Sequence, residues 1–421
     1  MKLSPETRAT TVESLANLLT EQHAFPEAGQ EMADRIQGRL AQGDYDEIVD
    51  VDAFCAALTG DLHAVSHDLH LAVYHQPHEA AAIARAEAET NTEKEPSTLW
   101  WEQVACDNYG FKRLEVLTGN VGYLDVRYFA PVSLAAETVV AAMRFLEGCD
   151  AWIFDLRQHG GGDPFTVQLI ESYLFGSEPK LLLTLYERPT GKRQQLWTLP
   201  HVPGRRRPHI PVYVLTSGRT FSGGEDFAYT LQQHGRATVV GEMTGGGAHT
   251  VEFKVVHGDI VVSMPTGYPT HPVTGSNWEG TGVVPNIAVD AAQALARAHV
   301  EAIERLIRES WDQRPERARS LQWDLQEVRA SHTPLVLSPG RLQGYVGTYG
   351  SYTVTLEDGV LHMSQSGGRV VWTLTPLTET RFAVDETYHA RFVYDGSGCA
   401  SAFVWLHKGD DHEITVPREG D

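Results

Sequence analysis

Residues 214–249 read VLTSGRTFSGGEDFAYTLQQHGRATVVGEMTGGGAH, and the pattern of this stretch decides the fold. The apolar run PVYVL that leads into it predicts a buried strand, GGEDFAYTLQQHG predicts a helix, and ATVVG predicts a second strand. Strand, helix and strand in this order are typical of an α/β unit. Ser222 lies at the turn between the first strand and the helix, directly ahead of Gly223 and Gly224.

The same alternation extends on both sides of this stretch. The apolar runs VGYLDV, AWIFDL and KLLLTLY alternate with helical patterns such as SLAAETVVAAMRFLEG, and an amphipathic helical region covers residues 290–332. The sequence therefore predicts an α/β core with a trailing helix over residues 101–333.

The two ends of the chain have different patterns. Helical periodicity dominates the first 65 residues and gives way to a period of two at Leu69, Leu71 and Val73, so residues 1–75 are predicted to be a helical domain that ends in a short strand. Residues 76–100 read as a helix and a polar linker. Short strand patterns with glycine-rich turns follow from Leu335, which predicts an all-β antiparallel module over residues 334–421.

Composition excludes several classes of function. The chain of 421 residues has 34 Lys and Arg against 55 Asp and Glu, a formal net charge of -21, which repels nucleic acid and anionic lipid. Neither a signal peptide nor a segment of roughly 20 apolar residues is visible, so a cytoplasmic protein without membrane contact is expected. The four cysteines have no metal-site or disulfide spacing and are expected to be reduced.

Ser222 has two interpretations. A serine ahead of a helix is a favoured N-cap, and Glu225 and Asp226 in the first turn complement the helix dipole. Alternatively, Ser222 is a nucleophile, because helix N-termini present free amides and glycine lets a substrate carbonyl approach. On this interpretation the N–H of Gly223 is a natural donor to an oxyanion. The cap explains the two acids but not the paired glycines, which weaken a helix start.

Two further glycine-rich stretches follow strands. FDLRQHGGGDP runs from an apolar strand into Gly160, Gly161 and Gly162, whose backbone N–H groups could face a ligand. GEMTGGGAHT superficially resembles a phosphate-binding loop, but Gly247 and Ala248 occupy the positions at which that motif requires Lys and Ser or Thr.

Four stretches together resemble a known family, the C-terminal processing (tail-specific) serine proteases, and within it the branch with the tricorn core protease and the interphotoreceptor retinoid-binding protein repeats. These stretches are HAVSHDLHL, FDLRQHGGGDP, the stretch quoted first, and NWEGTGVVPNI, and they follow the order of the family between residues 63 and 287. The resemblance implies a crotonase-like core of β-β-α units, a serine endopeptidase activity without a cofactor or metal, and a peptide or unfolded protein as substrate. It leaves a homo-oligomer open.

The resemblance also implies the roles of individual residues. It makes Ser222 the nucleophile and His67 the general base, with Ser66 and Glu279 completing a tetrad that orients the histidine. The oxyanion hole would combine the N–H of Gly223 with an N–H from the glycine run, that of Gly161 or Gly162.

The sequence departs from the family in four places. Gly247 stands where one branch has a lysine base, which disfavours a Ser-Lys dyad, and residues 75–121 are too few for an inserted peptide-binding PDZ domain. His159 replaces the polar residue, usually asparagine, that precedes the glycines of the family. Asn286 replaces the usual aspartate.

Three rival interpretations remain beside the peptidase. A metal site at His63, His67, His70 and His75 is disfavoured, since the carboxylate spacing of H-E-x-x-H is absent and His70 and His75 read as strand residues. An esterase of the α/β-hydrolase fold would need G-x-S-x-G and a histidine after the serine. A non-catalytic carrier of hydrophobic ligands such as retinoids or fatty acids is the strongest alternative, because relatives in this branch are carriers.

Overall fold

The computed structural model describes residues 3–88, 104–367, 370–394, 398–409 and 412–419, and the chain divides into two compact units. The first unit contains Met1–Glu115 and Gly122–Ala294, and the second contains Val116–Val121 and Leu295–Asp421. Of the helix and linker predicted over residues 76–100, the part from residue 89 onward lies outside the described residues. None of the described helices combines the length and the apolarity that a membrane span requires.

Three helices open the first unit: α1 (Pro5–Gln22), α2 (Pro26–Ala41) and α3 (Val51–Ser66). The side chain of Ser4 caps α1 by accepting the N–H of Thr7, and Asp50 caps α3 in the same way. The apolar faces of the helices share one hydrophobic cluster with strand residues such as Val262 and Met264. The helical domain predicted from the sequence therefore packs within the same compact unit as the core.

The strands beneath these helices form an antiparallel sheet in the order β1-β10-β5-β6, and β9 pairs with β10 from Ile260 to Gly267. The long strand β10 pairs with three neighbours, β1, β5 and β9, and so connects the strands of this sheet. The strands are β1 (Ala72–His75), β5 (Leu181–Glu187), β6 (Lys192–Trp197), β9 (Thr250–His257) and β10 (Ile260–Thr270). Helix α4 (Pro77–Ala88) follows β1 directly.

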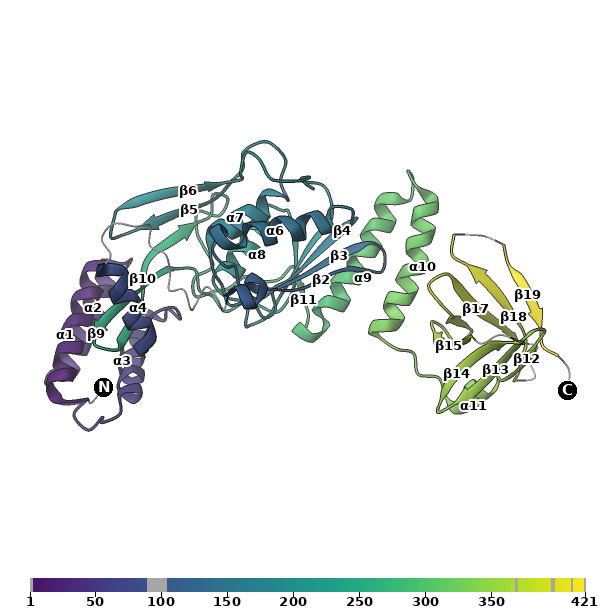
Figure 1. Cartoon of the computed structure of the whole chain (residues 1–421), viewed down its shortest axis with the longest axis horizontal. Helices are drawn as coiled ribbons and strands as arrows, with labels where there is room; N and C mark the ends of the chain where they lie inside the picture. Colours follow the sequence, from purple (N-terminus) through teal and green to yellow (C-terminus); the bar gives the residue numbers. More distant parts are fainter. Residues whose placement is uncertain (1–2, 89–103, 368–369, 395–397, 410–411, 420–421) are drawn as a thin grey trace. The chain divides into compact units, whose positions relative to one another are not determined.

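The second sheet of this unit has the order β11-β8-β7-β4-β3-β2, and its strands β4, β7, β8 and β11 run parallel. Helices from between the strands pack against it around one apolar core (Figure 1). The elements are the short helix η1 (Asn108–Gly110), β2 (Phe111–Leu117), β3 (Val121–Val126), α6 (Val132–Leu146), β4 (Ala151–Asp155), α7 (Pro164–Ser172), β7 (Val212–Thr216), α8 (Gly223–Gln233), β8 (Thr238–Gly241) and β11 (Ile287–Ala288).

The parallel strands β4 and β7 place their carboxyl ends at the same edge of this sheet. Asp155 pairs with Leu215 at that edge, so the segments that leave the two strands start side by side. One segment leads to the glycines 160–162 and the other leads to Ser222. This edge is where ligands bind in open α/β sheets.

The second unit is formed by helices and an eight-stranded antiparallel sheet with the strands in chain order. A bridge between Tyr349 and Arg418 joins the two ends of this sheet, which makes it nearly a closed barrel around an aromatic core. The helices are α9 (Ala291–Ser310), which begins in the first unit, α10 (Pro315–His332) and α11 (Pro339–Gln343). The strands are β12 (Gly347–Tyr349), β13 (Tyr352–Glu357), β14 (Val360–Gln365), β15 (Val371–Pro376), β16 (Arg381–Ala383), β17 (Tyr388–Tyr394), β18 (Ala400–His407) and β19 (Ile414–Pro417).

The predicted fold class is confirmed: helices at the start, an α/β core and an antiparallel β-module at the end. All four cysteines are free thiols, as expected, with Cys55 and Cys149 buried and Cys106 and Cys399 exposed.

Candidate active site

Ser222 has an unusual backbone at the turn between β7 and α8. Its φ of 51° and ψ of -119° lie outside the regions that residues other than glycine prefer. A strained residue of this kind persists only when the surrounding contacts hold it, and such residues concentrate at functional sites. The turn leaves the side chain of Ser222 half-buried at the first turn of α8.

Glu225 is the main contact that holds this turn. Its side chain is fully buried, and Oε2 accepts the N–H of Ser222 at 2.8 Å and that of Gly247 at 2.9 Å. Oε1 accepts the N–H of Gly246 at 2.7 Å and the hydroxyl of Thr244 at 2.5 Å. Burial raises the pKa of Glu225, although these donors oppose the increase. The acid that we interpreted as a dipole partner therefore ties Ser222 to the loop at residues 244–247.

The glycine run lies directly against Ser222 and the start of α8. A methyl group on Gly161 would lie 2.8 Å from Cβ of Ser222, and one on Gly223 would lie 3.0 Å from the N of Gly162. Gly161 and Gly162 have φ of 117° and 132°, values that residues with a side chain rarely adopt. The structure therefore places Ser222, Gly223, Gly161 and Gly162 next to one another.

The backbone N–H groups of the run have different partners. That of Gly160 donates to the carbonyl of Arg127 at 2.8 Å, and that of Gly161 donates to Nδ1 of His159 at 3.1 Å. Within the described part of the chain, the N–H groups of Gly162 and Gly223 have no hydrogen-bond partner. Of the two glycines that the sequence offered as second donor, Gly162 is the one with a free N–H.

Ser66 and His67 have no hydrogen bond to Ser222 among the described residues. Helix α3 ends at Ser66, and His67 adopts the left-handed conformation with φ of 53°, which turns the chain at the end of the helix. Its side chain is exposed, and among the described residues neither side chain makes a hydrogen bond or an ion pair. The predicted tetrad is therefore not assembled around His67, because the helix end directs that residue to solvent.

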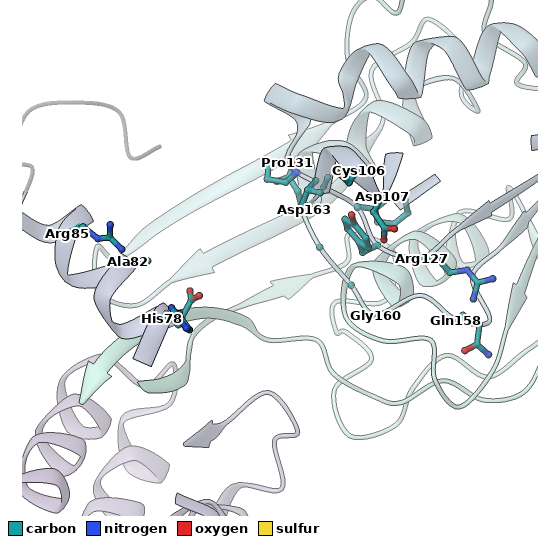
Figure 2. Close-up of a pocket in the computed structure, with 17 residues that line it drawn as sticks. His78, Ala82, Arg85, Cys106, Asp107, Arg127, Pro131, Gln158, Gly160 and Asp163 are labelled. Carbon is teal, nitrogen blue, oxygen red and sulfur yellow. The ribbon is translucent and has the colours of Figure 1, made fainter. Parts of the chain in front are cut away.

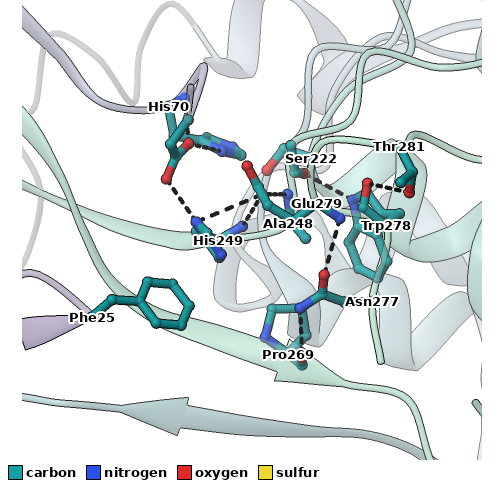
Figure 3. Close-up of polar contacts among 12 residues, drawn as sticks. Phe25, His70, Ser222, Ala248, His249, Pro269, Asn277, Trp278, Glu279 and Thr281 are labelled. Carbon is teal, nitrogen blue, oxygen red and sulfur yellow. Dashed lines mark hydrogen bonds and ion pairs between the residues drawn. The ribbon is translucent and has the colours of Figure 1, made fainter. Parts of the chain in front are cut away.

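His70 points toward Ser222 instead (Figure 3). Its ring packs on Phe221, the residue before the serine, with centroids 4.6 Å apart. A methyl group on Gly247 would lie 2.6 Å from Cε1 of His70. Both ring nitrogens are buried, and neither has a hydrogen-bond partner among the described residues. The sequence interpretation took His70 for an ordinary strand residue, yet His70 is the histidine with unused nitrogens beside Ser222.

Asp68 holds His70 in this position. Its Oδ1 accepts the N–H of His70 at 2.8 Å and lies 3.6 Å from Nδ1 of the same residue. Its Oδ2 accepts from Nδ1 of His249 at 2.6 Å. Burial by itself would raise the pKa of Asp68, but the hydrogen bonds from His249 and His70 outweigh burial and hold the pKa well below its usual range.

Glu279 reaches the same cluster from the loop after β10. Its Oε2 accepts the N–H of Ala248 at 2.6 Å and that of His249 at 3.3 Å, and it lies 3.6 Å from Nδ1 of His249 (Figure 3). Asp68, His249 and Glu279 each offer a ligand atom within 4.8 Å of the others, which could hold a metal ion. The hydrogen bonds already satisfy these atoms, so the cluster is complete without an ion.

Two more acids are buried behind the start of α8. Burial raises the pKa of Asp226 to about 7, and its carboxylate accepts the hydroxyl of Thr230 at 3.0 Å. Burial, and then the charge of Asp226, raise the pKa of Glu171 on α7 well above its usual value. Oε1 of Glu171 has no partner among the described residues. The raised pKa values favour the protonated forms of Asp226 and Glu171, close to the proposed nucleophile Ser222.

A cavity of about 1570 Å³ opens beside the glycine run (Figure 2). Gly160, Gly161 and Gly162 line it together with Phe129 and residues of α4. Gly162, whose N–H has no partner among the described residues, is one of the lining residues, and the cavity is large enough for several residues of an extended peptide.

Two models of known protein families match this chain. Residues 120–289 match peptidase family S41, and residues 3–104 match the N-terminal domain of that peptidase in eukaryotic IRBP. The chain belongs to peptidase family S41. The first match contains Ser222, the glycine run and Glu279, and the second contains His70. The family resemblance read from the sequence is thus confirmed.

Solved structures with a similar arrangement share little sequence with this S41 chain. A lipoprotein from Streptococcus agalactiae is 12% identical over 72% of this chain and 99% of its own, with a TM-score of 0.46. The photosystem II D1 C-terminal processing protease is 12% identical over 70% of this chain and 97% of its own, with a TM-score of 0.45. The tricorn protease is 12% identical over 72% of this chain and 37% of its own, with a TM-score of 0.46.

Proposed function

We propose that the protein is a serine endopeptidase that cleaves peptides or unfolded proteins through an acyl-enzyme on Ser222. The observation that carries this proposal is the position of Ser222, a strained serine at a helix start. Among the described residues, the N–H groups of Gly223 and Gly162 next to it are free, and the histidine on its other side makes no hydrogen bond with its ring nitrogens. These are the nucleophile, the oxyanion donors and the base that acyl transfer requires.

In the proposed reaction His70 takes the role that the sequence interpretation gave to His67. His70 removes the proton of the Ser222 hydroxyl while Oγ attacks the carbonyl carbon of the peptide bond. The negative charge on the carbonyl oxygen is stabilised by the two free N–H groups. Collapse of this intermediate breaks the C–N bond, and the amine leaves with the proton from His70. Water, deprotonated by His70, then attacks the acyl carbon, the bond from this carbon to Oγ of Ser222 breaks, and His70 returns the proton to Oγ.

The carboxylates of Asp68 and Glu279 keep the imidazole of His70 in place. Asp68 supports this role because it accepts the backbone N–H of His70 and faces Nδ1. Glu279 supports it through His249 and through the loop at residues 248 and 249. Ser66 has no part in this version of the mechanism.

One observation favours a second function. The match of residues 3–104 to a domain of IRBP is compatible with a carrier of hydrophobic ligands that shares the fold. A carrier does not need a free nucleophile, so Ser222→Ala would keep the binding of a fluorescent fatty acid or of retinol. An esterase would use the same serine on small esters and not on peptides.

The test is covalent labelling followed by digestion. We expect a fluorophosphonate to label Ser222, as located by peptide mapping, and we expect the protein to cut labelled casein without any effect of EDTA. Ser222→Ala should lose both reactions, since loss of a nucleophile costs roughly a million-fold in turnover. Labelling at another residue, or cleavage that survives in Ser222→Ala, would refute the assignment.

A further inference from the structure

The imidazole of His159 is enclosed behind the glycine run. The residue has an exposed fraction of 0%, and its ring packs against Phe129 with centroids 4.2 Å apart. Burial lowers the pKa of His159 to about 3, so the ring is neutral at every pH at which an ordinary histidine base works. A neutral imidazole has one N–H and one lone pair.

The contacts of His159 assign these two groups. Nδ1 accepts the N–H of Gly161 at 3.1 Å, so Nδ1 carries the lone pair and the proton is on Nε2. Within the described residues Nε2 has no partner. The N–H at Nε2 therefore stays without a hydrogen-bond partner among the described residues, while Nδ1 accepts the N–H of Gly161.

The surrounding backbone fixes the ring in this place. The carbonyl of His159 accepts the N–H of Phe221 at 3.0 Å, which joins the end of the β4 segment to the residue before Ser222. A methyl group on Gly224 would lie 2.5 Å from Nδ1 of His159. Only glycine at 224 admits the imidazole, which explains the second glycine of the Ser-Gly-Gly sequence.

The contact matters because glycines are free to rotate. Gly161 and Gly162 have backbone angles that a chain of glycines adopts only when its surroundings impose them. If the N–H of Gly161 lost its acceptor, the peptide between Gly160 and Gly161 could turn, which would change the backbone angles at Gly161. The next peptide, which carries the N–H of Gly162, would then be held only through its carbonyl, which accepts the N–H of Phe129 at 2.9 Å. We propose that His159 is a positioning residue of the oxyanion hole: by accepting the N–H of Gly161, it keeps the N–H groups of Gly162 and Gly223 free for the substrate.

This proposal rests on the proposed function of Ser222, and its test separates the two. His159→Phe fills the space but offers no acceptor. His159→Asn keeps an acceptor, because its amide oxygen is bonded to Cγ in the same way as Nδ1 of histidine. His271 offers a matched control, because it is also fully buried, accepts a backbone N–H at Nδ1 and has no partner on Nε2 among the described residues. Gly224→Ala keeps His159 but displaces its ring.

The measurements are the second-order rate of fluorophosphonate labelling of Ser222, and kcat and KM for one fluorogenic peptide. In labelling, Oγ of Ser222 bonds to phosphorus, fluoride leaves, the base takes the proton, and the P=O oxygen lies in the oxyanion hole. We expect His159→Phe to lower the labelling rate and kcat by about 10- to 100-fold with KM within about threefold, since a whole donor is worth about 10²- to 10³-fold.

His159→Asn should recover most of that loss, Gly224→Ala should reproduce it, and His271→Phe should match the wild type. If His159→Phe does not fold, the labelling rate and kcat of Gly224→Ala are compared with those of His159→Asn instead. An unchanged rate in His159→Phe, an equal loss in His159→Asn, or an equal loss in His271→Phe would each overturn the proposal. Failure of the wild type to be labelled at Ser222 would instead overturn the proposed function.

Discussion

Nδ1 of His249 lies 2.6 Å from Oδ2 of Asp68, so two residues that are 181 positions apart in the chain are joined by one buried hydrogen bond. Asp68 belongs to the turn after α3, and His249 precedes β9. This bond links the N-terminal helical part of the first unit to the loop with Ala248 and His249, whose N–H groups donate to Glu279. It also fixes the turn that presents His70.

The first prediction concerns this bond. Asp68→Asn should lower the free energy of unfolding at pH 7 by about 3 kcal/mol, the lower end of the range for a broken buried pair. The folded-state pKa of Asp68 is depressed, so the stabilisation is present above the unfolded-state pKa of about 3.9 and is lost as the pH falls below it. Urea unfolding at pH 7 and pH 3.5 measures both effects.

The matched control is Asp46→Asn, because the carboxylate of Asp46 is exposed and lies 4.0 Å from Arg8. An exposed pair contributes roughly 0 to 1 kcal/mol. If both variants unfold at the urea concentration of the wild type, the bond between Asp68 and His249 does not stabilise the fold.

The second prediction separates the two candidate bases. His70→Ala should lower kcat/KM by about 10⁴-fold or more, because without a base the hydroxyl of Ser222 stays protonated. His67→Ala, three residues earlier, should stay within about threefold of the wild type, since the exposed side chain of His67 has no partner in the described part of the chain. Each variant needs only one peptide substrate and a circular dichroism spectrum. The reverse order of losses would restore His67 as the base.

The contrast between these two histidines shows which features could be predicted from the sequence. Ser222 and the glycines of the site were predictable because their signals are local: an apolar strand, a glycine pair or run, and then a helix. The position of His67 was not, because it depends on the left-handed turn that ends α3. A usable signal was present in Asp68-Leu69-His70, since an aspartate that accepts the N–H two residues later makes a compact turn.

Other parts of the site differ in the same way. The role of Glu225 could have been predicted from Ser-Gly-Gly-Glu, which has the spacing of a capping box. The role of His249 could not be predicted, because its partner Asp68 is distant in the sequence and comes close to it only in the folded protein. His159 was noticed as a departure from the family, but its burial and its contact with Gly161 exist only in three dimensions. The fold class was predictable throughout because alternation between strands and helices is a chain-wide pattern.

The third prediction tests the shape of the glycine run. Gly162→Ala should abolish activity and destabilise the protein by several kcal/mol, because the methyl group would lie 2.1 Å from the carbonyl oxygen of Phe129 at a φ of 132°. Gly160→Ala is the control, since Gly160 has open space around it. It should change the free energy of unfolding by less than about 0.5 kcal/mol. Thermal unfolding and casein digestion distinguish them, and equal behaviour of the two variants would contradict this account.

The last prediction concerns Asp226, the buried acid in the first turn of α8. Its pKa is raised by burial from 3.8 to about 7 in the folded protein. Between these two values the folded state holds a proton that the unfolded state has released. The free energy of unfolding should therefore fall as the pH rises from about 4 to about 7, and the loss from this group should be complete above that range. Glu171 lies in the same buried pair and adds to the effect in the same direction.

Asp226→Asn removes this titration while it keeps an oxygen that can accept the hydroxyl of Thr230. The variant should therefore gain stability relative to the wild type as the pH rises, by roughly 3 kcal/mol between pH 5 and pH 8, because each pH unit up to the folded-state pKa contributes about 1.4 kcal/mol. Urea unfolding of both proteins at pH 5, 6, 7 and 8 measures this difference. Asp34→Asn, on the exposed face of α2, should show none. A constant difference between wild type and Asp226→Asn across this range would mean that Asp226 is already ionised in the folded protein at pH 5.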